Sequence, residues 1–181
     1  MKLLYACIPA LLLTMMLSCN DNPEAGRGPS VNWNNPEKGK KDKDFLSAAY
    51  SAGLMEIEAA NYVENMLGSK TVKDLAVAMV SAHSAMNDRI KSIADKEKIS
   101  LPEGLTPEQR QKILSLQSKG GSSPDKAYAD LLVKDHTVAV ALFQKASKNA
   151  KDKNVKEFFS EELSEIQHHL EMATAARTKL K

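Results

Sequence analysis

The chain of 181 residues is long enough for one domain with a single core and short for two. Its 25 lysines and arginines nearly balance 23 acidic residues and are interspersed with them, which argues against a nucleic-acid-binding protein. Only 5% of the residues are aromatic, whereas alanine, leucine, methionine, glutamate and lysine are abundant, so the composition favours an all-α fold.

Residues 1–18 have the pattern of a lipoprotein signal peptide. Lys2 precedes an apolar run that is shorter than a membrane span, is interrupted by Pro9 and ends just before Cys19. The letters MLSC resemble a lipobox, in which the cysteine is lipidated. We therefore expect an exported, periplasm-facing lipoprotein, anchored through Cys19 in the inner or outer membrane; the alternative is ordinary secretion with cleavage nearby. Cys7 would leave with the signal, which excludes disulfides and cysteine-ligated zinc.

Residues 19–43 form a second region, which is rich in asparagine, proline, glycine and lysine and has no apolar periodicity. Such a composition predicts a flexible tether. The folded domain is then expected to span residues 44–181.

From residue 44 onward, apolar residues recur at steps of three and four, which predicts helices. Thr106, Pro107 and Gln109 form a capping box with proline at the first helical position, which predicts a short helix. The expected helices are residues 44–67, 70–96, 107–118, 124–150 and 154–179. Two pairs of long helices, joined by a long crossover that carries the short helix between the second and third long helices, describe a ferritin-like four-helix bundle.

Each long helix has one candidate ligand on its apolar stripe. These residues, which we call the Glu/His layer, are Glu56, His83, His136 and His169. At about 1.5 Å per residue, the first two lie at similar heights from the turn that joins their helices, and so do the last two. Inward-facing imidazoles and carboxylates at matched depth are how helix bundles build metal sites.

Burying these groups without partners costs about 1–3 kcal/mol each. One transition-metal ion would satisfy them, and three imidazoles with a carboxylate suit iron, zinc, manganese or copper. The alternatives are a hydrogen-bonded Glu–His network with water, or histidines that tip out to solvent. Convergence of the layer depends on how the crossover pairs the two halves of the bundle, which the sequence leaves undetermined.

Three residues of the last helix are alternates near the layer. Glu162 lies on the stripe but about two turns away, and His168 turns towards the edge of the stripe. Glu165 and His168 reproduce the Glu-x-x-His of di-iron bundles. Val80, however, stands where the second helix would need a glutamate, which argues against a di-iron oxidase or an iron-storing ferritin.

Two residues near His136 are candidate supporting partners. Asp135 and Tyr128 could orient the imidazole by hydrogen bonding. For Asp135, however, a position on the surface is the stronger expectation.

The segment from residue 44 to about residue 176 resembles the bacterial domain-of-unknown-function 4142 family, a ferritin-like four-helix group of exported proteins. The resemblance is carried by DFLSAAYSAGLMEIEAA, VKDLAVAMVSAH, YADLLVKDHTVAVALFQKA and VKEFFSEELSEIQHHLEMA, one from each long helix. The positions that match the polar pattern of the family are those of the Glu/His layer. The resemblance implies a fold and export, and it implies no particular activity.

The leading hypothesis is a lipid-anchored envelope protein that binds a transition metal through the Glu/His layer. One alternative is a non-enzymatic structural or stress-related module whose buried layer only fixes packing; another is a metal-dependent oxidoreductase. No nucleophile–base pair, phosphate loop or pair of acid catalysts is visible, so no catalytic residue is assigned. The expected partner is the membrane, through the anchor; a homodimer is compatible with the sequence.

Overall fold

The computed structural model describes residues 42–65, 68–118 and 124–180. Within these ranges the fold is all-α, as predicted, and its helices are α1 (Asp42–Glu64), α2 (Lys70–Lys96), α3 (Pro107–Ser118), α4 (Pro124–Asn149) and α5 (Lys153–Lys179). The predicted signal peptide, Cys19 and most of the predicted tether lie outside the described residues. No helix in the described ranges combines the length and apolar content needed to cross a membrane.

The helix boundaries follow local capping signals. The ranges of α2 and α3 match the prediction, and α4 and α5 differ from it by one residue at a boundary. Ser69 and Asp152 cap α2 and α5, because their side chains accept hydrogen bonds from the N–H groups of Val72 and Val155. Helix α1 begins at Asp42, two residues before the predicted start.

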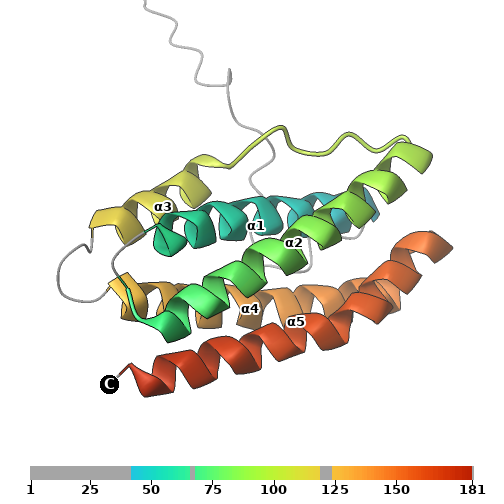
Figure 1. Cartoon of the computed structure of the whole chain (residues 1–181). Helices are drawn as coiled ribbons and strands as arrows, with labels where there is room; N and C mark the ends of the chain where they lie inside the picture. Colours follow the sequence, from blue (N-terminus) through green and yellow to red (C-terminus); the bar gives the residue numbers. More distant parts are fainter. Residues whose placement is uncertain (1–41, 66–67, 119–123, 181) are drawn as a thin grey trace, which may run out of the picture.

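The four long helices pack as a bundle in which α1 contacts α2 and α4, and α5 contacts α4 and α2 (Figure 1). The segment after α2 runs back along the bundle to α3, which lies against α1 and α4. The capping box is confirmed, because Thr106 N–H donates to Gln109 Oε1 (2.9 Å) and Gln109 N–H donates to Thr106 Oγ1 (3.2 Å). Gln109 also bonds twice to Ser51, which fastens α3 to α1.

Two carboxylates connect one helical pair to the turn of the other pair. Asp42, at the start of α1, accepts hydrogen bonds from the N–H groups of Lys151 and Asp152 at 2.8 and 2.6 Å. Asp125, at the start of α4, accepts one from Ser69 N–H at 2.8 Å. These contacts join the start of α1 to the α4–α5 turn and the start of α4 to the α1–α2 turn, so they set the relative heights of the two pairs.

Two apolar clusters fill the core, one on each side of the Glu/His layer. The first includes Met55, Met79, Leu132 and Ala173. The second includes Ala49, Met86, Phe143 and Ile166. Along α2, α4 and α5 the histidine of the layer falls between the residues of the two clusters, and on α1 Glu56 lies next to Met55 of the first cluster. Other buried polar residues, among them Ser51, Asn87 and Gln109, lie outside the layer.

Replacing Asp42 tests whether its carboxylate holds the two pairs together. We expect Asp42→Ala to lower the free energy of unfolding by about 2 kcal/mol, since hydrogen bonds to a charged group contribute roughly 1.5–3 kcal/mol. The matched control is Asp44→Ala, which removes a carboxylate from the same helical turn. Urea unfolding of both variants measures the difference; equal losses would show that Asp42 acts only through the helix dipole.

Candidate metal centre

The structure brings the four residues of the Glu/His layer together from four helices. Their exposed fractions are 2% for Glu56, 3% for His83, 0% for His136 and 2% for His169. The three ring centroids form a nearly equilateral triangle, with separations of 5.5, 5.1 and 5.3 Å. The histidines therefore face one another in the core and do not tip out to solvent.

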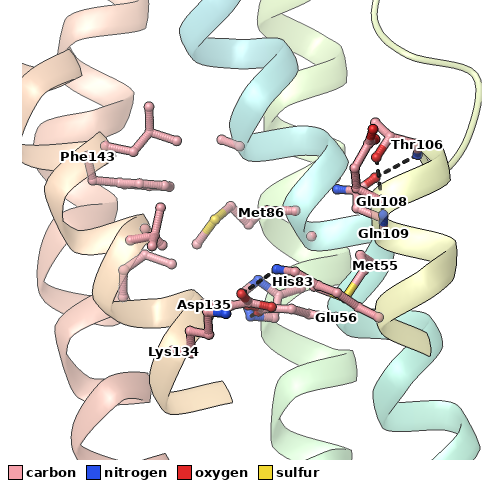
Figure 2. Close-up of a pocket in the computed structure, with 18 residues that line it drawn as sticks. Met55, Glu56, His83, Met86, Thr106, Glu108, Gln109, Lys134, Asp135 and Phe143 are labelled. Atoms are coloured by element: carbon pink, nitrogen blue, oxygen red, sulfur yellow. Dashed lines mark hydrogen bonds and ion pairs between the residues drawn. The ribbon is translucent and has the colours of Figure 1, made fainter. Parts of the chain in front are cut away.

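The Glu56 carboxylate lies at one edge of this triangle. Its Oε2 is 2.6 Å from Nε2 of His83, and its Oε1 is 3.5 Å from Nδ1 of His136. Figure 2 shows the first contact bridging α1 and α2. Burial by itself raises the pKa of the Glu56 carboxyl, but the neighbouring His136 and His83 rings lower this pKa to about 2. Glu56 is therefore ionised at neutral pH.

Two histidines have one ring nitrogen engaged outside the triangle. His136 Nδ1 donates to the carbonyl of Leu132 at 3.1 Å, and His169 Nε2 donates to Glu165 Oε1 at 3.0 Å. In a neutral imidazole the second nitrogen then carries a lone pair. Burial, with the neighbouring His83 and His136 rings, lowers the pKa of His169 to about 3, so this ring is neutral at pH 7.

Two ring nitrogens of the triangle lack hydrogen-bond partners in the described part of the chain, namely Nε2 of His136 and Nδ1 of His169. Nε2 of His83 lies against Glu56 Oε2. Each histidine offers a ring nitrogen such that all three lie within 4.8 Å of one another. Because bonds from nitrogen to a transition metal are about 2 Å long, ligands of one ion lie at most about 4 Å apart, so the rings would need to move slightly inward to bind a single ion. The donor set and its outer hydrogen bonds fit a metal site.

The alternates on α5 divide into one supporting residue and two remote ones. Glu165 contacts His169, which lies four residues further along the helix. It does not contact His168, the histidine of the Glu-x-x-His pattern. The His168 side chain is 60% exposed and lies 4.0 Å from Glu171. Glu162 pairs with Arg89 and does not join the layer.

The expected surface position of Asp135 is wrong. Its side chain is 11% exposed and pairs with Lys112 of α3 at 2.5 Å. Burial raises the pKa of Asp135, although Lys112 opposes this shift. Tyr128 is fully buried, and burial, followed by the charge of Glu56, raises its pKa. Neither side chain hydrogen bonds to His136 within the described ranges.

Sequence reasoning missed a cavity of about 390 Å³ that borders the layer at Glu56 and His83 (Figure 2). It also missed two contacts around the layer, those of Lys112 with Asp135 and of the Leu132 carbonyl with His136. The four-residue spacing of Glu165 and His169 was a usable signal. No local signal places Lys112 of the crossover opposite Asp135.

A family model described as "Domain of unknown function (DUF4142)" matches residues 29–176. The chain belongs to the DUF4142 family. This membership confirms the resemblance found in the sequence, and the description of DUF4142 assigns no activity. A search of curated proteins found no match.

This DUF4142 protein is similar in structure to a chain titled "Crystal structure of DUF305 fragment from Deinococcus radiodurans". The TM-score is 0.68 and the sequence identity is 12%, over 77% of this chain and 96% of that chain. At this identity the similarity concerns the fold alone. It supports the helical arrangement of the DUF4142 domain and says nothing about a ligand.

The neutral state of His169 predicts acid sensitivity of the metal-free protein. Below pH 6.5 the unfolded chain binds a proton at this histidine, whereas the folded chain does so only near pH 3. Stability is therefore lost as pH falls between these values, by about 1.4 kcal/mol per pH unit. Urea unfolding at pH 7 and pH 5 should show the loss. His169→Gln should reduce it and the exposed His168→Gln should not; an unchanged loss in His169→Gln would contradict the assignment.

Proposed function

We propose that this DUF4142 protein binds one transition-metal ion in the bundle core, through the three histidines of the Glu/His layer with Glu56 as a fourth ligand. The observation that carries the proposal is the buried cluster of three histidines, in which Nε2 of His136 and Nδ1 of His169 have no partner in the described part of the chain. Leaving them unsatisfied costs about 1–3 kcal/mol each, and a metal removes this cost.

The outer hydrogen bonds support the proposal. Metal-bound histidines commonly donate their other ring N–H to a carboxylate or a backbone carbonyl, which fixes the tautomer and the ring orientation. His169 has the carboxylate of Glu165 in this role, and His136 has the carbonyl of Leu132. In His83 the nitrogen that faces the layer lies beside Glu56, whose negative charge favours a cation at the same place.

Three imidazoles and one carboxylate suit iron, zinc, manganese or copper, and such an ion supplies Lewis-acid or redox chemistry when bound. The arrangement we propose for the helices is ferritin-like, with two antiparallel pairs and a long crossover. The layer has one carboxylate, whereas di-iron bundles use four glutamates and two histidines. We therefore favour a single ion over a di-iron centre.

The alternative function is a structural module in which the layer only fixes packing. A hydrogen-bonded network accounts for the contact between Glu56 and His83, but it leaves the inward nitrogens of His136 and His169 without partners. A metal-dependent oxidoreductase is a second candidate, because a cavity of about 390 Å³ reaches Glu56 and His83.

Elemental analysis of protein purified without an affinity tag tests metal binding. After exposure to iron, zinc, manganese or copper, we expect the wild type to retain about one ion per chain. His83→Ala and His136→Ala should each lower retention at least tenfold, since loss of one of four ligands weakens a site strongly. His168→Ala is the matched control and should retain the metal. Equally low metal in the wild type and all variants would refute the proposal.

We also propose that the protein is a lipid-anchored envelope protein, on the basis of the apolar run before Cys19. In Triton X-114 phase separation of whole-cell extracts, the wild type should enter the detergent phase. Cys19→Ser should move to the aqueous phase, because it cannot be lipidated. Equal partitioning of the two proteins would refute lipidation at Cys19.

A further inference from the structure

The cavity beside the Glu/His layer has charged side chains from three helices in its wall (Figure 2). Three carboxylates and two ammonium groups line it, those of Glu56 from α1, Glu108 and Lys112 from α3, and Lys134 and Asp135 from α4. Within the layer, Glu56 and His83 line the cavity, whereas His136 and His169 do not. The layer therefore meets the cavity at its carboxylate, which attracts cations.

We propose that the metal ion enters the layer through this cavity, and that Asp135 is the ligand that transfers it to Glu56 and His83. In this role Asp135 binds the ion during entry and release, and the four residues of the layer hold it in between. The inference deepens the proposed function and rests on it, because it concerns the path of the same ion.

The Asp135 carboxylate has an oxygen available for an incoming ion. Its Oδ1 pairs with Lys112 at 2.5 Å, while its Oδ2 is buried without a hydrogen-bond partner in the described part of the chain. An ionised carboxylate oxygen only accepts, so a cation or a hydrogen-bond donor can satisfy it and an anion cannot. A passing metal ion is such a partner.

Asp135 lies beside the layer. It precedes His136 in α4, and Figure 2 shows it at the same height along the bundle as Glu56. Burial raises the pKa of the Asp135 carboxyl, Lys112 opposes this shift, and the charge of Glu56 adds to it. The two carboxylates therefore lie within electrostatic range of each other, and an ion on Asp135 is attracted onwards to Glu56.

Lys112 occupies the transfer ligand when no ion is present. Its ammonium group competes with an incoming cation for the Asp135 carboxylate. Because the Lys112 side chain is 35% exposed, it can turn towards solvent when the ion arrives and does not stay buried without a partner.

The side of the layer at α5 is less open to an ion. Glu165 is half-exposed there, but it accepts a hydrogen bond from the outer nitrogen of His169, a ring that is 2% exposed. An ion arriving past Glu165 would have to displace this ring from the core. The cavity leads to Glu56 and His83 without such a displacement.

The rate of metal uptake tests the inference. Metal-free protein is mixed with the ion that the wild type retains in elemental analysis. Samples are quenched with EDTA at set times and desalted, and the bound metal is measured. Asp135→Asn should take up the ion at least fivefold more slowly, since it lacks the charge that attracts the ion.

Release of the ion to EDTA provides a second readout. A transfer ligand acts on the path in both directions, so Asp135→Asn should slow release by the same factor and retain as much metal as the wild type at equilibrium. Loss of a ligand of the bound state would speed release and lower retention.

A charge-reversed comparison separates ion transfer from a latch on α3. Asp135→Asn and Lys112→Met break the same ion pair, so both would speed uptake if the pair only held α3 beside the cavity. Transfer through Asp135 predicts opposite effects, slower uptake in Asp135→Asn and faster uptake in Lys112→Met. Asp135→Glu keeps the carboxylate and should restore uptake.

The matched control for the charge is Asp130→Asn. Asp130 lies on the same helix and pairs with Arg177, but it does not line the cavity, so this variant should take up the ion like the wild type.

Two alanines test the path itself. Ala52→Leu narrows the cavity one helical turn before Glu56 and should slow uptake at least fivefold, also if Asp135→Asn unfolds the protein. Ala141→Leu adds the same side chain at an exposed position of α4 and should keep the wild-type rate.

The outcomes separate this inference from the metal proposal. A wild-type or faster rate of uptake in Asp135→Asn, or a wild-type rate in Ala52→Leu, overturns the inference while metal binding stands. Wild-type protein that retains none of the four metals overturns the proposed function, and the inference falls with it.

Discussion

The structure depends on one constraint, which is that polar groups buried between two apolar clusters need partners. The Glu/His layer meets this constraint only in part. Glu56 lies in close contact with His83. The Leu132 carbonyl accepts a hydrogen bond from His136, and the Glu165 carboxylate accepts one from His169. Nε2 of His136 and Nδ1 of His169 remain unpartnered in the described part of the chain, so the interior keeps a destabilising feature at a defined point. Such a feature is expected where a bound ion contributes to stability and function.

The rest of the fold holds this layer in register. Asp42 and Asp125 accept hydrogen bonds from backbone N–H groups in the turn of the opposite helical pair. These bonds set the heights of the four long helices relative to one another. Gly68 allows one of these contacts, because a Cβ there would lie 2.6 Å from Asp125 Oδ1. The crossover is fastened separately, where Gln109 bonds to Ser51. Small changes in these peripheral contacts would therefore shift the histidines in the core.

The layer is not symmetrical. His136 and His169 belong to the pair α4–α5, and neither lines the cavity, whereas Glu56 and His83 from the pair α1–α2 do. One side of the layer is therefore enclosed by protein, and the other side borders the cavity. Helix α3 lies beside this cavity, and the ion pair of Lys112 with Asp135 holds α3 to α4. An enclosed ligand set with one accessible side is the arrangement that lets a metal centre meet a second ligand.

The sequence by itself determined the helices and the residues that face the core, because apolar spacing and caps such as Ser69 and the Thr106–Gln109 box act within a few residues. It also identified the members of the Glu/His layer. Only the tertiary structure decided that the two halves of the layer meet, since the sequence places Asp42 in the predicted tether, with no sign of its contacts to the α4–α5 turn. The burial of Asp135 and the cavity likewise arise from contacts between segments far apart in the chain, which local periodicity does not predict.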